Sequence, residues 1–516
     1  MARFMNAGYL ITRSAQYFPD RTAFVIEGES KSFRHLNMRV NKLANELLLL
    51  GLKKGDRVGL LFHNSFPYLE SYLALYKAGL VWVRLNARLA PSEIRRMIQD
   101  SETLALIHGP EFAEVAEEVS AELQWIIHSG DGDGLDYEEC LQKGSEQEPE
   151  TDVYLDDLCD IWYTSGTTGS PKGIMLTHRN IISCTQFLLS DVYDITSKDQ
   201  FLTAGALSHA GSVRVLPFVI RGAVCHLHRH FDPLKILHET ETLKITDWAV
   251  VPTMLIAIMD HPEFSRFDLS SLKRITYAGS PLPVERIKEA VEKFGPILDQ
   301  SYGQAESIIT ITHLPKEEHK IDGDPTREKR LASAGREYPG VQIQIVDDND
   351  NILGPGEIGE VITRSDLLMR GYWNQPHKTE EALRGGWLHT GDIGYMDGDG
   401  YLYLLDRKHD RIITGGLNVF PRELEEVIST HPAVAQVAVF GVEDPFWGEA
   451  VTATVVLRKG AEAGEDELMA FCKDRLAGYK RPKKFHYLKD LPKNQYGKVL
   501  RKDLKKKFRG IKQGVS

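Results

Sequence analysis

The alternation of helix and strand patterns over the first 110 residues limits the fold more than any other feature of the sequence. Leu36, Val40, Leu43 and Leu47 recur at the spacing of one helix face, and the apolar strand pattern V-G-L-L-F begins at Val58. The alternation continues with a helix over 67–78, a strand over 81–85, a helix from 91 and a strand over 104–107. Strands that alternate with helices predict a mostly parallel sheet whose faces are covered by the helices.

The pattern changes twice further along the chain. The glycine-rich and acidic stretch 130–157 predicts a surface connection. From Val341, short alternating strands separated by turns such as D-D-N-D-N predict antiparallel sheet. After Asp410, a helix over 422–430, strands at 434 and 451 and a helix over 465–476 predict a small α+β domain. The expected fold is therefore α/β: a large N-terminal domain of covered, mostly parallel sheets with a small antiparallel β subdomain, followed by an α+β C-terminal domain.

Length and charge limit the classes of function. A chain of 516 residues exceeds one ordinary core, and a net charge of -11 argues against a general nucleic-acid binder. The five cysteines are scattered without a C-x-x-C pair, which favours a reducing compartment. No apolar stretch approaches the roughly 20 residues of a membrane span, and no signal-peptide pattern is visible at the N-terminus. A cytoplasmic enzyme with no integral membrane segment is expected.

The segment I-W-Y-T-S-G-T-T-G-S-P-K-G at Ile161 has the composition of a phosphate-binding loop. Glycines let backbone amides turn toward a ligand, and five hydroxyls lie near the charge of Lys172. The alternative is an ordinary Gly-Pro turn between two core elements. The spacing differs from the common G-x-x-x-x-G-K-[ST] loop, because Pro171 precedes Lys172 and a glycine follows it. A different nucleotide chemistry is therefore indicated.

Five further segments have the same mixed character and follow in order. They are A-G-S-P at Ala278, Y-G-Q-A-E-S at Tyr302, W-L-H-T-G-D-I-G at Trp387, L-D-R-K-H-D-R-I-I-T-G-G at Leu405 and L-P-K-N-Q-Y-G-K at Leu491. With the loop at Ile161, this series closely resembles the adenylate-forming superfamily, and specifically its acyl-CoA synthetases. The resemblance covers essentially the whole chain, and six motifs in one order are far more specific than any single one.

The resemblance implies an ATP-dependent carboxylate:CoA ligase that works in two steps. A carboxylate and ATP give acyl-AMP and pyrophosphate, and the thiol of coenzyme A then gives acyl-CoA and AMP. Mg2+ is the implied metal cofactor. The segments expected to line the acid pocket, near His209, from Val250 and from Ser307, are mostly apolar, so an apolar aliphatic or aromatic acid is expected.

The resemblance also implies roles for residues of the large domain, 1–406. Glu306 and Thr164 are expected at the magnesium ion, and Asp392 is expected at the ribose together with Arg407, the first residue of the C-terminal part. His209 is expected where the acyl pocket meets the thiol tunnel. The remaining residues expected around the phosphates and the adenine are Thr164, Ser165, Gly166, Thr167, Thr168, Gly169, Lys172, Gly279, Ser280, Pro281, Tyr302, Gly303 and Gln304.

In the C-terminal part, 407–516, the resemblance implies a mobile lid. Lys498 is expected to bridge the substrate carboxylate and the α-phosphate in the first step. Gly415 and Gly416 are expected to leave room for the pantetheine chain in the second step. Whether the protein forms a homo-oligomer stays open.

Two positions depart from the family pattern. Ala305 stands where threonine is common, and His409 stands at a pivot that is usually aspartate or lysine.

Three other functions stay open. An acyl-AMP ligase that loads a carrier-protein pantetheine shares the first step, and a luciferase-like oxygenase shares the fold. A nucleotide-binding protein without catalysis is the third alternative, although Lys498, Glu306 and Asp392 are all present.

Overall fold

The structure, a computed structural model, describes residues 6–164, 172–493 and 499–509 and divides into two compact units. The first unit contains Met1–Ile343 and Thr363–His389, and the second contains Gln344–Ile362 and Thr390–Ser516. The expected functional boundary after residue 406 lies inside the second unit. As the pivot of a moving lid, that boundary stays a prediction.

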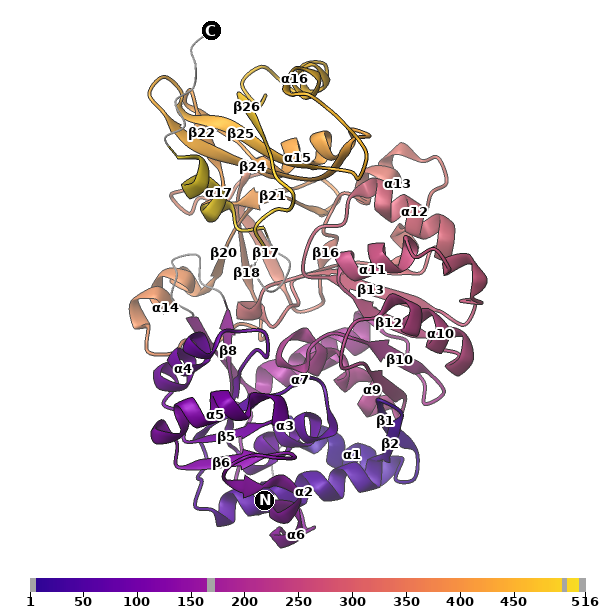
Figure 1. The fold of residues 1–516 in the computed structure, drawn as a ribbon, viewed down its shortest axis with the longest axis vertical. Helices are drawn as coiled ribbons and strands as arrows, with labels where there is room; N and C mark the ends of the chain where they lie inside the picture. Colours follow the sequence, from indigo (N-terminus) through magenta and orange to yellow (C-terminus); the bar gives the residue numbers. More distant parts are fainter. Residues whose placement is uncertain (1–5, 165–171, 494–498, 510–516) are drawn as a thin grey trace. The chain divides into compact units, whose positions relative to one another are not determined.

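The first unit contains a nine-stranded sheet in its described part (Figure 1). The neighbours β13–β14, β12–β13, β10–β12, β10–β11 and β1–β11 are all parallel, and the antiparallel strands lie at the two ends. The strand order is β16 (Arg336–Glu337), β15 (Thr312–Leu314), β14 (Leu298–Tyr302), β13 (Arg274–Ala278), β12 (Asp247–Val250), β10 (Gln200–Thr203), β11 (Val224–Leu227), β1 (Thr22–Ile26), β2 (Glu29–Ser32).

A second sheet of eight described strands belongs to the same unit. Its strands from β8 to β7 are parallel, and β9 and β19 add antiparallel pairs at one edge. The order is β19 (Gly371–Tyr372), β9 (Lys172–Thr177), β8 (Leu158–Thr164), β4 (Val81–Arg84), β3 (Arg57–Leu61), β5 (Ala105–His108), β6 (Trp125–His128), β7 (Leu135–Asp136).

Helices cover these sheets, and α11 packs against β13 and beside α10 and α12 (Figure 1). The α-helices of the first unit are α1 (Tyr9–Tyr17), α2 (Phe33–Leu49), α3 (Phe66–Ala78), α4 (Pro91–Asp100), α5 (Ala113–Val119), α6 (Tyr137–Lys143), α7 (His178–Phe187), α8 (Ser212–Arg214), α9 (Leu216–Arg221), α10 (Pro233–Leu243), α11 (Pro252–Met259), α12 (Val284–Phe294), α13 (Pro325–Arg330), α14 (Pro376–Ala382).

Helix α3 shows how local sequence signals set an element. The Ser65 hydroxyl caps the helix by accepting from the backbone N–H of Tyr68, and Pro67 lies in the first turn, where no N–H is needed. Gly79 ends the helix in the left-handed conformation at φ 70°. The chain then enters β4 directly, so β3, α3 and β4 form one strand–helix–strand unit.

The second unit contains most of a four-stranded sheet, in the order β17 (Gln342–Val346), β18 (Gly359–Arg364), β20 (Leu388–Met396), β21 (Leu402–Arg407), in which β20 and β21 are antiparallel. Its other sheet has the order β23 (Leu417–Val419), β22 (Ile412–Thr414), β25 (Gly448–Leu457), β24 (Val434–Asp444), and β26 (Lys484–Tyr487) pairs with β25. The helices α15 (Pro421–Ser429), α16 (Glu465–Lys473) and α17 (Arg501–Phe508) complete the unit.

The expected fold class is confirmed: mostly parallel covered sheets in the large N-terminal part, antiparallel sheets after residue 341 and an α+β C-terminal part. The stretch 130–157 connects β6 to β8 and is mostly exposed or half-buried, as expected of a surface connection, but it also contains the short elements β7 and α6. Its acidic end is also anchored, since the Glu148 carboxylate accepts from the Lys77 ammonium at 2.8 Å and from Thr12 and Asn41. A buried lysine needs a charged partner. The Glu148 carboxylate provides it and so holds the end of the stretch 130–157 against α2 and α3.

A buried ionic network lies at the amino ends of β12 to β14. Arg274 pairs with Asp247 at 3.1 Å and with Asp299, and His313 on β15 bonds both Asp299 and Asp191. Burial alone lowers the pKa of His313, but the two carboxylates outweigh it and raise the pKa to about 9. The imidazolium is therefore paired on both ring nitrogens at neutral pH.

This pairing predicts a stability that falls at high pH. The folded pKa of His313 lies above its unfolded value of about 6.5, so the stabilisation is complete below that pH and is lost as pH rises through 9. We expect a loss of about 2–3 kcal/mol, from the size of the shift. The melting temperature should therefore fall more steeply between pH 6.5 and 9.5 for the wild type than for His313→Gln. Equal slopes for the two proteins would contradict the stabilising role of the His313 imidazolium.

Candidate active site

Four parallel strands bring the expected ligand-binding loops to one edge of the nine-stranded sheet. Strand β10 is followed by the segment that contains His209, β12 by Val251, and β13 by Gly279 to Pro281. Strand β14 ends at Tyr302 and is followed by Gly303 to Glu306. Because the carboxyl ends of parallel strands share one edge, these loops are neighbours. That edge is where α/β sheets bind their ligands.

Lys172 and Glu306, expected at the phosphates and at the metal, are connected by one tyrosine. The Lys172 ammonium lies 4.8 Å from the centroid of the Tyr372 ring, and the Tyr372 hydroxyl donates to Glu306 Oε1 at 3.0 Å. Tyr372 is on β19, which pairs with β9 directly beside Lys172, and the Glu306 carbonyl accepts from the backbone N–H of Met369. A cation and a carboxylate are thus held around one aromatic side chain, on segments distant in sequence.

The loop that carries Glu306 is tightly folded. A side chain at Gly303 would place a Cβ 2.2 Å from the carbonyl carbon of Ile309, so the close approach requires glycine. Ile308 and Ile309 both have left-handed backbone, at φ 43° and 65°, which costs a β-branched residue about 1–3 kcal/mol. The buried Cys184 contacts the carbonyl of Ile308 and the hydroxyl of Thr310 from α7. The strained loop is therefore packed against the buried Cys184 side chain of α7.

His209 lies half-buried in the turn between β10 and α8. Its carbonyl accepts from the Arg84 guanidinium at 3.1 Å, its Nδ1 contacts the Ser208 hydroxyl at 2.8 Å, and its ring meets Trp162 edge-on. Burial first, and then the positive charges of Arg84 and Arg88, lower the pKa of His209 to about 3. The imidazole is therefore neutral and a weak base at neutral pH, which suits a lining role better than proton abstraction.

In the second unit, the two residues expected at the ribose form a pair. Asp392 on β20 lies opposite Arg407 on β21, and its Oδ1 lies 2.7 Å from Arg407 Nε. Arg407 also donates to the carbonyl of Thr390, whose hydroxyl accepts from the backbone N–H of Asp392. The carboxylate is thus oriented by charge and by backbone.

Gly415 and Gly416 form the two-residue turn of the hairpin β22–β23. Their φ angles are 57° and 79°, as a type I′ turn requires at both positions. The backbone of the turn therefore explains why both positions are glycine without any ligand. Their expected place beside the pantetheine stays a prediction.

Several expected residues lie outside the described part of the chain: Ser165, Gly166, Thr167, Thr168, Gly169 and Lys498. Thr164 ends β8 and is paired with Lys172 on β9. Ala305 begins the short turn Ala305–Ser307 that carries Glu306, and the backbone N–H of Gln304 donates to the Ser307 hydroxyl. His409 follows β21, with Nε2 3.9 Å from an Asp410 oxygen.

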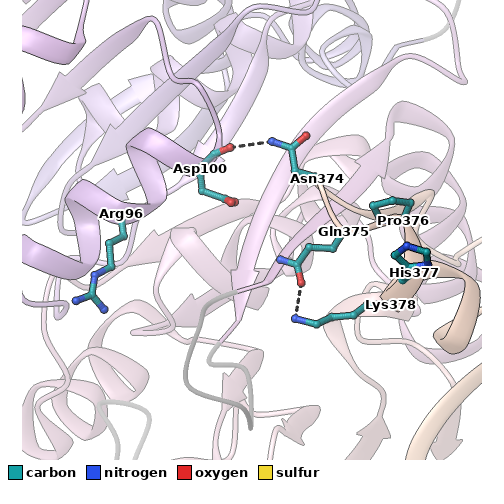
Figure 2. A pocket seen from close by; sticks show the side chains of 7 residues that line it. All are labelled: Arg96, Asp100, Asn374, Gln375, Pro376, His377 and Lys378. Carbon is teal, nitrogen blue, oxygen red and sulfur yellow. Dashed lines mark hydrogen bonds between the residues drawn. The ribbon is translucent and has the colours of Figure 1, made fainter.

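A cavity of about 500 Å3 lies elsewhere in the first unit, between α4 and the start of α14 (Figure 2). Its residues bond one another: the Asn374 amide donates to the backbone carbonyl of Asp100, and the Lys378 ammonium donates to the side-chain oxygen of Gln375. None of the described residues expected at the site lines it. It is therefore separate from the loops at the sheet edge.

Sequence reasoning missed Tyr372, whose only signal is an aromatic residue within the polar run M-R-G-Y-W-N. It also missed Arg84, a charged residue inside the apolar strand V-W-V-R-L. Arg84 is fully buried, pairs with Asp160 at 2.6 Å and stacks with Trp82 and Trp162. An arginine in a buried strand is a signal of a buried ion pair.

Within the described residues, no helix combines the length and the apolar character needed to span a membrane. Comparison with known proteins gives two family matches: residues 11–373 match the AMP-binding enzyme model, and residues 423–498 match the model of the AMP-binding enzyme C-terminal domain.

Similar proteins span the same length. A feruloyl-CoA synthase from Amycolatopsis is 36% identical over 98% of this chain and 100% of its own. A long-chain-fatty-acid–CoA ligase from Bacillus subtilis is 34% identical over 96% of this chain and 93% of its own. The crystal structure of ATP-bound MatB from Rhodopseudomonas palustris matches with a TM-score of 0.88 and 31% identity, over 99% of this chain and 100% of that one.

Two family models in sequence order, full-length relatives and one shared fold agree with the order of motifs and with the loops at the sheet edge. The chain belongs to the AMP-binding enzymes of the adenylate-forming superfamily and is an acid–thiol ligase, an AMP-forming acyl-CoA synthetase.

Proposed function

We propose that the protein activates an acid with a largely apolar body in two steps. A carboxylate oxygen attacks the α-phosphorus of ATP, an acyl–phosphate bond forms and pyrophosphate leaves. The sulfur of CoA then attacks the acyl carbonyl, the thiol proton is lost and AMP leaves. The observation that carries the proposal is the connection of Lys172 to Glu306 through Tyr372, beside the loops that follow β13 and β14.

The charges of this arrangement suit a triphosphate. A carboxylate and ATP repel each other, so the site must supply positive charge and orientation before displacement can occur. Lys172 supplies one charge at the start of β9, directly after the glycine- and hydroxyl-rich segment. We assign Thr164 and the segment 165–171 to the β- and γ-phosphates, because their glycines and hydroxyls precede the charge of Lys172 directly in the sequence.

Glu306 fits a magnesium ion by the chemistry of its oxygen atoms. Mg2+ prefers hard oxygen ligands and is usually held by one or two carboxylates together with phosphates and water. The ion would neutralise phosphate charge, and the Tyr372 hydroxyl would fix the orientation of the Glu306 carboxylate.

The remaining roles are proposed from the resemblance alone. We assign Asp392 and Arg407 to the ribose hydroxyls, because the carboxylate can accept both and the guanidinium can donate to the same sugar. We assign Lys498 to the reacting centre in the first step, and the lid 407–516 to a movement that withdraws it for the second. The Asp392–Arg407 pair holds the carboxylate in place before the sugar binds.

The activity can be tested directly on purified protein. ATP, Mg2+, CoA and a panel of acids from acetate through benzoate to palmitate should give AMP, pyrophosphate and acyl-CoA in equal amounts, measured by mass spectrometry. Formation of acyl-AMP without consumption of free CoA would point instead to a carrier-protein ligase. Release of ADP, or no acid-dependent exchange of pyrophosphate into ATP, would overturn the proposal.

Tyr372→Phe should weaken the use of Mg2+·ATP. The variant keeps the aromatic ring beside Lys172 but removes the hydroxyl that donates to Glu306. A lost hydrogen bond to a carboxylate costs about 1.5–3 kcal/mol, or roughly tenfold to a hundredfold in kcat/KM for ATP. We expect the Mg2+ concentration at half-maximal rate to rise while the KM for the acid is unchanged. Equal changes in both would indicate a general loss of structure.

A further inference from the structure

Arg214 on α8 is a buried cation without a carboxylate partner. Its side chain is 4% exposed, Nη1 donates to the Tyr193 hydroxyl at 3.3 Å, and Nη2 is buried without a hydrogen-bond partner in the described structure. No described aspartate or glutamate forms an ion pair with it. The stretches outside the described residues contain no acidic side chain that could do so.

The phenols of Tyr193 and Tyr338 and the thiol of Cys184 lie near the Arg214 guanidinium. Burial raises the pKa of Cys184 to about 11 and the pKa of Tyr338 well above its usual value, so neither supplies a negative charge. A buried guanidinium without a carboxylate partner carries a desolvation penalty that a bound anion would offset.

The other buried arginines of the described chain provide a comparison. Arg84 lies 2.6 Å from the carboxylate of Asp160, and Arg274 lies 3.1 Å from that of Asp247. In both cases the fold itself supplies the anion. At Arg214 the described fold supplies no carboxylate, and the Nη2 group has no hydrogen-bond acceptor.

The position of Arg214 connects it to the active-site edge. It lies five residues after His209, in the segment that follows β10. Its neighbour Cys184 contacts Ile308 and Thr310 in the loop of Glu306, and its neighbour Tyr338 bonds Ser301 at the end of β14. Arg214 is thus connected, through Cys184 and Tyr338, to the loop of Glu306 and to the end of β14.

We propose that Arg214 binds a second carboxylate, carried on the distal part of the acid substrate. The guanidinium presents several N–H donors in a planar fork that matches a carboxylate, and a charged ligand group would compensate the buried charge. The pocket then selects acids with an apolar body and an anionic end. This inference rests on the proposed ligase function and names the substrate class within it.

Matched pairs of acids test the inference on the full-length protein. The pairs hexanoate and adipate, octanoate and suberate, and benzoate and terephthalate differ only in the second carboxylate. We expect the wild type to prefer the dicarboxylate in at least one pair by about tenfold or more in kcat/KM. Arg214→Met should lose that preference and gain activity on the monocarboxylate, Arg214→Lys should keep part of it, and Arg221→Met, an exposed position on α9, should leave it unchanged.

Each outcome decides. A wild type that activates monocarboxylates as well as or better than every matched dicarboxylate overturns the inference, even if Arg214→Met fails to fold. So does a preference that Arg214→Met retains, or one that 6-hydroxyhexanoate satisfies as well as adipate, since a neutral acceptor then suffices. If no acid in the panel is adenylated, the proposed function fails as well, and the two failures are distinguishable.

Discussion

Lys498→Ala is expected to slow acyl-adenylate formation by about a hundredfold or more. A lysine that bridges the substrate carboxylate and the α-phosphate stabilises charge mainly in the transition state, so its loss lowers kcat and not only binding. The measurement is acid-dependent exchange of labelled pyrophosphate into ATP. The second step should be affected far less, which can be measured by adding CoA to a synthetic acyl-adenylate.

Lys493→Ala is the matched control. Lys493 lies in the same motif, is exposed and approaches Asp490 at 3.6 Å, so a general effect of removing one positive charge from this segment would appear there too. Wild-type exchange rates in Lys498→Ala would exclude the assigned role. Equal losses in both variants would mean that the segment contributes only a general positive electrostatic potential, and not a specific contact of Lys498.

The helices and strands could be predicted where local signals define them. For α3, Ser65, Pro67 and Gly79 cap and end the helix, and the predicted range 67–78 differs from the observed helix by one residue. Pairings between distant segments could not be predicted. Strand β1 lies between β2 and β11, and its partner Cys225 is about two hundred residues from Phe24. Nothing in either segment identifies the other.

The candidate site shows the same division. The resemblance named Asp392 and Arg407 separately, and the structure joins them in one pair, because a short antiparallel hairpin places them opposite each other. The contacts of Tyr372 with Glu306 and of Arg214 with Tyr193 join residues that are separated in sequence. An arginine pattern cannot tell a paired side chain from an unpaired one, so Arg214 becomes informative only when its neighbours are known.

Gly416→Leu is expected to spare adenylation and to block thioester formation. The proposed reason is that the absent side chain leaves a path for the narrow pantetheine chain in the second step. A Cβ at Gly416 meets no atom within 4 Å in the described structure, so the first carbon of a leucine side chain has room there. The remaining penalty is backbone strain at φ 79°, about 1–2 kcal/mol for an L-residue.

Gly416→Asn separates that strain from the loss of the path. Asparagine tolerates left-handed backbone and is common in type I′ turns, so the hairpin β22–β23 should persist with a shorter side chain. We expect Gly416→Asn to retain more thioester formation than Gly416→Leu, with pyrophosphate exchange near wild type in both. If both half-reactions fall together in the leucine variant, the turn and not the path is the cause. If both persist, pantetheine does not pass Gly416, and the two glycines serve the hairpin alone.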